Sequence, residues 1–225
     1  MNNPLADHRL GRLGRYATLV LLCTFALFCH GCMLGWALSG TMGAQVQKAQ
    51  FTLAKVPTLV LVENYAEDPR GNVDADRLSA DIGETLAEHK AVPIIPMDNL
   101  ARFREANPNT YPHMTIAEIG RALRARQVLY VNIKSYAFDT PAGSDKVHGT
   151  VLVFVKVVST DTGQSIWPAD SVEGDPVTAQ SDYADADPNG INMDAKLDLN
   201  DTLSDKIGQL FYDYQPDFDS DVMGD

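Results

Sequence analysis

Cysteine is the residue type whose distribution says most about chemistry in this chain. All three copies, Cys23, Cys29 and Cys32, lie within the first 32 of the 225 residues. A thiolate is both a nucleophile and a metal ligand. The part of the chain after residue 50, here called the body, has no cysteine. It therefore has no disulfide, no thiolate metal site and no cysteine nucleophile. The sequence therefore predicts that an apolar core alone stabilises this body.

No other catalytic pattern is present. The five histidines form neither H-E-x-x-H nor H-x-x-x-H, and the chain has no G-x-S-x-G, G-x-G-x-x-G or Walker loop. A glycosidase needs two carboxylates held across a cleft, and the acidic residues are mostly in loops and the tail. The sequence therefore predicts a protein that is not an enzyme and that needs no cofactor.

One segment has the spacing of a calcium ligand set. In DADPNGINMD (185–194), Asp185, Asp187, Asn189 and Gly190 match positions 1, 3, 5 and 6 of an EF-hand loop. Position 12 should be a bidentate glutamate, and it is Lys196. Two interpretations stay open here, a weak calcium site and a solvated acidic loop.

The N-terminal region has the order of an export signal. Residues 16–38 contain no Asp, Glu, Lys or Arg, and they follow Arg9, Arg12 and Arg15. This order predicts that the arginines stay in the cytoplasm and that the rest is exported.

Three interpretations of this segment remain open. In the first, the chain is cut between Gly31 and Cys32, and the Cys32 thiol carries diacylglycerol. In the second, the 23-residue run is never cut and spans the bilayer, for which about 20 apolar residues suffice. In the third, a conventional peptidase cuts near residues 37–39 or 44 and frees the protein.

Net charge excludes one class of partner. The chain carries −12, and removing residues 1–31 would remove three arginines and one aspartate and leave −14. A nucleic-acid-binding protein would need a basic stripe, and none is seen. Such an anionic body should also stay away from anionic headgroups unless it is tethered.

Hydrophobic periodicity predicts an α/β domain with a mixed sheet packed by helices, in the order β-α-β-α-α-β-β-β-α. The helix at 115–125 has the clearest start, a capping box at Thr115 and Glu118. Residues 169–193 are polar and acidic and are interpreted as a loop.

The expected strands are 57–65, 91–98, 127–138, 146–159 and 164–168, and the expected helices are 73–89, 98–107, 115–125 and 194–214. The expected divisions are a signal peptide or membrane anchor (1–38), a tether (39–51), the α/β domain (52–215) and an acidic tail (216–225).

The segments "IGRALRARQVLYVNI" and "VVSTDTGQSIW" resemble two structural motifs of a bacterial envelope lipoprotein superfamily. That superfamily includes the curli secretion lipoprotein, the activator lipoproteins of penicillin-binding proteins and the N-terminal domain of the Tol propeller protein. The resemblance covers residues 57–168 and, more loosely, the last helix. Residues 146–159 are apolar on both faces and lack the alternation of a membrane hairpin, so a pore is not expected.

The resemblance implies a membrane-tethered, non-catalytic interaction or assembly module on the periplasmic side of the envelope, anchored through a lipidated Cys32 or an uncleaved N-terminal helix. Its expected partner is another envelope protein or a second copy. The alternative is a lipoprotein that binds or hydrolyses a solute or glycan. Tyr130, Tyr136 and Phe138 are predicted to share an exposed face of the 127–138 strand and to form a contact patch, because aromatic side chains are enriched in interface cores. A helix covering that face is the competing interpretation.

Overall fold

The computed structural model describes residues 46–64, 73–186 and 193–216. Residues Lys48–Tyr214 form one compact unit, and its centre is a six-stranded mixed sheet. The strands are β1 (Thr58–Asn64), β2 (Gln127–Asp139), β3 (Lys146–Ser159), β4 (Ser165–Trp167), β5 (Asp175–Gln180) and β6 (Ala184–Asp185). The predicted class, α/β with a mixed sheet packed by helices, is confirmed.

β3 is the central strand of this sheet. β2 pairs antiparallel with β3 along almost its whole length, and β1 pairs parallel with the first half of β2. The other edge of β3 pairs in turn with β4, β5 and β6. The apolar sequence at 146–159 predicted this central position. It did not predict that one face would be only half-buried, as the alternating burial along β3 shows.

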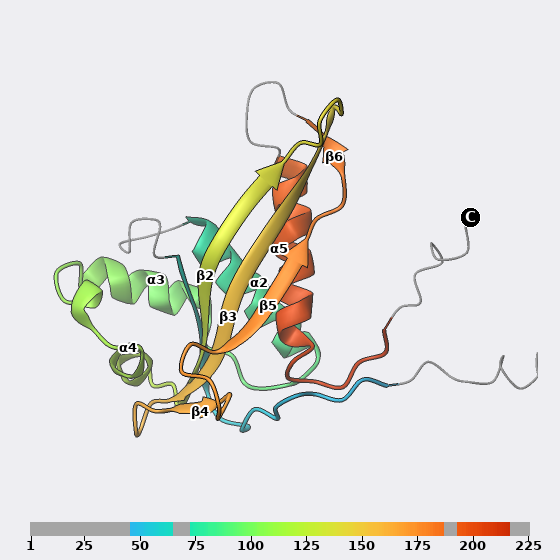
Figure 1. Cartoon of the computed structure of the whole chain (residues 1–225). Coiled ribbons are helices and arrows are strands. Elements are labelled where there is room, and N and C mark those ends of the chain that lie inside the picture. The colour runs from blue at the N-terminus through green and yellow to red at the C-terminus, as the bar shows by residue number, and fades with distance from the viewer. Residues whose placement is uncertain (1–45, 65–72, 187–192, 217–225) are drawn as a thin grey trace, which may run out of the picture. The chain divides into compact units, whose positions relative to one another are not determined.

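Helices cover both faces of the sheet, but to different extents. They are α2 (Val73–Glu88), α3 (Met97–Ala106), α4 (Ile116–Ala122) and α5 (Met193–Gly208), with a 3₁₀ turn η1 (Tyr111–His113) before α4. Figure 1 shows α2 and α5 side by side along one face, while α3 and α4 lie together at one end of the sheet. The second face is therefore covered only near β1 and the start of β2.

Two apolar cores follow from this arrangement. The larger lies between α2, α5 and the sheet and includes Ile82, Leu203 and Val153, none of which is exposed. The smaller joins β1 and β2 to α3, η1 and α4 and includes Leu100 and Ile119. Burying a side chain of this size contributes about 1.5–3 kcal/mol, so these two cores supply the stability that cysteine cannot.

The start of α4 follows directly from its sequence. The Thr115 backbone N–H donates to the Glu118 carboxylate at 2.8 Å, and the Glu118 N–H donates to the Thr115 hydroxyl at 3.3 Å. This is the predicted capping box. The Thr115 N–H and the Thr115 hydroxyl both donate to the Glu118 carboxylate, and these two bonds hold the pKa of Glu118 below its usual range.

Both outer edges of the sheet are blocked against further pairing. The buried Ser79 hydroxyl donates to the Val60 carbonyl at 2.7 Å on β1. On β5, Pro176 has no N–H, and the Lys206 ammonium donates to the Thr178 carbonyl at 3.1 Å. Strand edges with free backbone groups recruit other chains, and these contacts reduce that tendency.

Two sequence-based predictions about elements were wrong. Residues 91–98 do not form a strand, because their two prolines leave a single bridge between Thr58 and Ile94 before α3 begins. Residues 169–193 are not simply a loop, since they contain β5 and β6. Val177 and Ala179 on β5 are buried in the larger core. The acidic segment is therefore partly a structural element of the sheet.

The two ends of the compact unit are bonded to each other. The Gln50 and Phe51 N–H groups donate to the Leu210 carbonyl at 2.9 and 3.1 Å. Lys48 forms an ion pair with Asp213 at 2.6 Å. A chain entering from the N-terminal side is thus fixed to the end of the C-terminal segment.

Candidate functional site

Most of the residues predicted to lie in the lipid and metal sites are outside the described part of the chain. These are Cys32, Asp187 and Asn189. Asp185 is described: it lies in β6, where it forms an ion pair with Lys146. Within the described residues, no group of three or more His, Cys, Asp or Glu is placed to hold a metal ion.

The predicted aromatic patch is not brought together. A bulge in β2 between Ile133 and Ser135 reverses the faces on which the following side chains lie. Tyr136 and Phe138 therefore pack against the larger core. Tyr130 is only 2% exposed and belongs to the smaller core on the opposite face. The assumption that the three share one exposed face was wrong.

Tyr136 and Phe138 instead attach the far end of the β2–β3 hairpin to α5. Their rings contact each other edge to face at 5.3 Å. The Tyr136 hydroxyl lies 3.4 Å from the Asn200 side-chain oxygen. A side chain at Gly149 would collide with Phe138 and Leu199 at 2.8 Å, so this glycine makes room for the aromatic contact.

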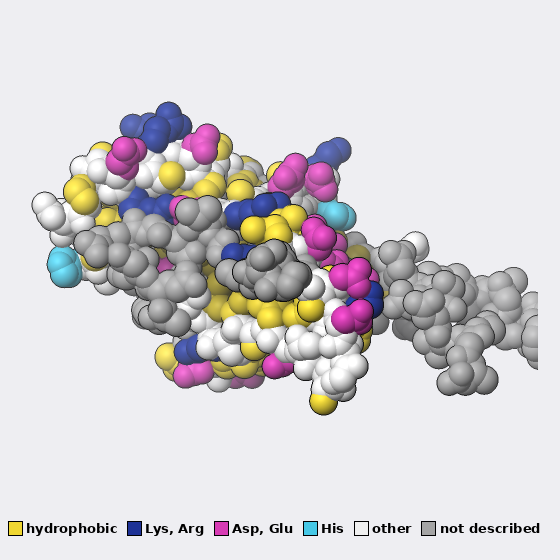
Figure 2. Space-filling view, turned by 90° about the horizontal axis from the view of Figure 1, so that it is seen from above, with side chains coloured by type: hydrophobic (Ala, Val, Ile, Leu, Met, Phe, Trp, Pro, Cys, Tyr) yellow, Lys and Arg dark blue, Asp and Glu magenta, His cyan; other side chains and the backbone are white. Residues whose placement is uncertain are grey.

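The described residues form two polar concavities of opposite charge. The first, here called the acidic groove, runs between α2 and α5 and encloses about 200 Å³. It is lined by Asp81, Glu84, Thr85, Glu88, Asp201, Ser204 and Asp205. Figure 2 shows several further acidic side chains on the face seen from above. The five carboxylates of the acidic groove suit a cationic partner and repel an anionic one.

Asp81 is a partly buried carboxylate of the acidic groove. Burial raises its pKa, and the charges of Asp201 and Glu84 raise it further, against the opposing effect of Arg77. The Arg77 guanidinium lies 3.8 Å from this carboxylate. Among the described atoms, the Asp81 Oδ2 has no hydrogen-bond partner. The native protein therefore holds this charge at a cost.

The second concavity, here called the basic pocket, lies where α4 meets the ends of β3 and β4. It encloses about 320 Å³ and is lined by Thr115, Ile116, Ala117, Arg121, Lys156, Val158, Thr162, Gly163 and Ser165. Its lining contains two cations and no acidic residue, although the whole chain has 30 acidic and 18 basic residues. The local charge is thus the reverse of the overall charge.

Small residues allow α4 to approach the sheet and form the wall of this pocket. A side chain at Gly120 would meet the Thr160 and Val128 methyl groups at 2.5 and 2.7 Å. The Arg121 guanidinium donates to the Thr160 carbonyl. Gly163 has a φ of +74°, which the turn between β3 and β4 requires. The Thr160–Gly163 turn therefore fixes the position of Arg121.

Sequence reasoning identified the pieces of this pocket but not their association. It found the Thr115–Glu118 capping box and the VVSTDTGQSIW segment, which contains Asp161 and Gly163, and it interpreted both as structural motifs. Arg121 and Lys156 are 35 positions apart, and no motif joins them. The sequence signal for this pocket was weak: Arg121 and Lys156 are basic residues near these two motifs in a chain that is acidic overall.

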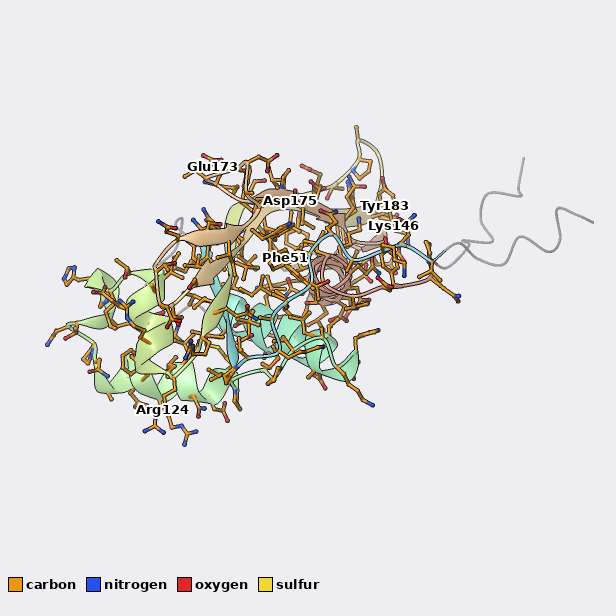
Figure 3. The ribbon with its side chains drawn as sticks, turned by 90° about the horizontal axis from the view of Figure 1, so that it is seen from below. Phe51, Arg124, Lys146, Glu173, Asp175 and Tyr183 are labelled. Atoms are coloured by element: carbon orange, nitrogen blue, oxygen red, sulfur yellow. The ribbon has the colours of Figure 1, made fainter. Side chains whose placement is uncertain are left out.

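Figure 3 shows the positions of several side chains outside the two concavities. Arg124 lies beside α4 at one end of the unit, and Lys146 and Tyr183 lie together at the β2–β3 hairpin end. Arg124 has a φ of +61°, in the turn that leads from α4 to β2.

Within the described ranges, no helix is both long and apolar enough to cross a bilayer.

Comparisons with known proteins give fold-level similarities only. No protein-family model matches the sequence, and no curated protein matches it. The lipoprotein GNA1162 from Neisseria meningitidis has 16% identity and a TM-score of 0.40, covering 63% of this chain and 90% of that chain. The PelC dodecamer from Paraburkholderia phytofirmans has 16% identity and a TM-score of 0.38, covering 75% and 97%. The LpoB C-terminal domain from Salmonella enterica has 14% identity and a TM-score of 0.34, covering 59% and 86%. These similarities are to bacterial lipoproteins and a lipoprotein domain among others, and at these values they identify neither a family nor a function for this chain.

Proposed function

We propose that this chain is a membrane-tethered, non-catalytic interaction or assembly module of the bacterial cell envelope. The observation that carries the proposal is the N-terminal order of three arginines, a 23-residue uncharged run and the Gly31–Cys32 pair. We further propose that Cys32 is the lipidated residue, and that the chain is related to the curli, penicillin-binding-protein activator and Tol proteins that its sequence resembles.

The distribution of thiols supports export of the body. A domain that folds without cysteine is unaffected by an oxidising compartment. Its described unit is built from two apolar cores and needs no cross-link. Lys48, at the start of the compact unit, forms an ion pair with Asp213 near its end.

The described surface supports a binding role. The acidic groove and the basic pocket give the unit two concavities of opposite charge. Charge complementarity contributes to partner choice and to the rate of association. We propose another envelope protein or a second copy of the chain as the partner.

Incorporation of radiolabelled palmitate into the full-length chain tests the anchor. We expect label in the wild-type chain and none in Cys32→Ala. The matched control is Cys29→Ala, which removes a neighbouring thiol preceded by Phe28 rather than by a small residue and should retain the label. Label that persists in Cys32→Ala would refute lipidation of Cys32.

Co-purification from solubilised membranes tests the binding role. Deleting residues 169–193 would remove β5 from the sheet, so it cannot separate loss of binding from loss of folding. The variant Asp201→Asn with Asp205→Asn changes only the exposed charge of the acidic groove. We expect it to lose a specific envelope partner, or self-association measured by light scattering, while its circular dichroism is unchanged. A single monomeric species without any specific partner, in both proteins, would contradict the proposal.

A further inference from the structure

We propose that the basic pocket is a binding site for an oxyanion group, a phosphate or a carboxylate, on a small ligand. This property is separate from the tethered interaction role, because it requires neither the anchor nor a protein partner. The enclosed volume of about 320 Å³ is at the lower end of the range for small-molecule sites. A compact ligand would therefore fill it.

The carboxylates nearest to the pocket are already engaged by other groups. Glu118 accepts from the Thr115 N–H and hydroxyl, both at 2.8 Å. Asp161 is paired with Arg126 at 2.8 Å. Among the described residues, Arg121 forms no ion pair with either of them, although its charge contributes to the lowered pKa of Glu118. The pocket therefore presents a cation whose charge is not balanced by a carboxylate within ion-pair distance.

Lys156 is the second such cation, and it is half-buried. Its ammonium lies 5.1 Å from the centre of the Tyr130 ring. It forms no ion pair with any described carboxylate. A cation–π contact offsets part of the cost of removing an ammonium from water, and a bound anion would offset more of it. Arg121 and Lys156 thus share an unfilled preference for negative charge.

The donors around the pocket suit an oxyanion. Arg121 uses one N–H on the Thr160 carbonyl, which fixes the guanidinium and leaves four N–H groups. Lys156 supplies three more. The Thr162 hydroxyl accepts the Gln164 N–H at 3.2 Å, and in the described part of the chain its own hydrogen has no acceptor. A guanidinium, an ammonium and a hydroxyl together match the acceptors of phosphate or carboxylate.

The acidic groove provides an internal comparison. It lies in the same unit, and its lining contains five carboxylates and no cation. These carboxylates repel an oxyanion, so the two concavities are expected to differ in anion binding. Binding that depends on Arg121 and Lys156 would be specific to the basic pocket.

Isothermal titration calorimetry on the full-length chain in detergent tests the site, at constant ionic strength so that screening does not vary. The probes are inorganic phosphate, glycerol phosphate and acetate. We expect saturable binding of at least one probe, with a Kd on the order of 1 mM or tighter. Arg121→Gln and Lys156→Gln should each weaken it about tenfold.

Lys134→Gln is the matched control. Lys134 lies on the neighbouring strand with its ammonium 5.4 Å from the Phe154 ring, and it does not line the pocket. We expect this variant to bind as the wild type does. If Arg121→Gln fails to fold, Lys156→Gln decides the question, because its glutamine keeps most of the stem over Tyr130.

The ranking of the probes identifies the source of the oxyanion. Tighter binding of glycerol phosphate assigns a phosphoester ligand, and tighter binding of acetate assigns a carboxylate; both support the site. Absence of binding by all three probes would overturn it. An equal loss in Lys134→Gln would also overturn it, since general surface charge would then explain the binding. Either failure leaves palmitate labelling of Cys32 unaffected, so it is distinguishable from failure of the proposed function.

Discussion

Gly120 is the position where a single methyl group should test the packing of α4 against the sheet. An alanine Cβ there would lie 2.5 Å from a methyl of Thr160 and 2.7 Å from a methyl of Val128. Both neighbours are buried and β-branched, so neither side chain can easily rotate away. Overpacking of this kind costs about 1–3 kcal/mol. Alanine gains about 1 kcal/mol over glycine in a helix interior. The difference between these two terms is a net loss of up to about 2 kcal/mol of unfolding free energy for Gly120→Ala.

Gly83→Ala is the matched control for the helical gain. Gly83 also lies inside a helix, α2, and a Cβ there would lie 3.2 Å from one methyl of the partly buried Ile94. We expect this variant to be within about 0.5 kcal/mol of the wild type or more stable. Urea denaturation gives both free energies. For a unit of this size, each kcal/mol corresponds to about 2–4 °C in Tm.

The comparison has a result that would refute the reasoning. If Gly120→Ala is as stable as Gly83→Ala, α4 does not approach β2 and β3 as closely as the structure shows. Arg121 would then not be fixed by the Thr160 carbonyl, and the wall of the basic pocket would be misplaced. A loss confined to Gly120→Ala supports the close approach.

Two further substitutions test single polar groups. Burial raises the native pKa of Asp81 above its value in the unfolded chain, so the free energy of unfolding falls as the pH rises from the unfolded pKa through the native pKa. Asp81→Asn should therefore stabilise the protein at pH 7 by less than about 1 kcal/mol. The difference in Tm from the wild type should shrink as the pH is lowered toward 4. A constant difference at all pH values would contradict this assignment. Ser79→Ala should lower the free energy of unfolding, measured by urea denaturation, by about 1–3 kcal/mol, because the Val60 carbonyl loses its donor. The control Ser204→Ala removes a hydroxyl that is bonded within its own helix, and it should lower this free energy by less. Equal losses would show that the β1 edge does not depend on Ser79.

Local signals were sufficient to predict most of the fold. The capping box at Thr115 fixed the start of α4 to the residue, and the apolar run at 146–159 indicated the central strand. Hydrophobic periodicity predicted the helix at 73–89, and in α2 the residues Leu78, Ile82 and Leu86, spaced four apart, are all buried. Each of these signals is contained within about one element. They succeed because capping, helical periodicity and β propensity act over a few residues.

β5 was missed because its sequence carries little strand signal. Only Val177 and Ala179 alternate inward, and Pro176 argues against a strand. The strand forms because it lies against β3 and because Lys206 of α5 bonds to its outer edge. Both partners are distant in sequence. A weak strand on an edge is thus decided by tertiary contacts rather than by its own residues.

The candidate site was missed for a related reason. The basic pocket takes Arg121 from α4 and Lys156 from β3, and Gly120 and Thr160 bring these elements together. Glycine in a helix normally weakens it, and nothing in the local sequence shows that a neighbouring strand requires the space. Such a site can be found only after the packing of α4 on the sheet is known.

One additional residue in β2 decides which side of the molecule carries its aromatic side chains. Before the bulge, Leu129, Val131 and Ile133 face the larger core; with Lys134 as the extra residue, Tyr136 and Phe138 then face it as well. Strict alternation would have placed these two rings on the same face as Tyr130, nearer the hairpin end of the strand. Because of the bulge, these two rings pack against the larger core and attach the β2–β3 hairpin to α5. Lys134 and Lys156 lie over aromatic rings on the opposite face, which the bulge leaves without the Tyr136 and Phe138 rings. The register of β2 therefore removes two apolar side chains from the face that carries these cations, and this favours ionic over apolar recognition there.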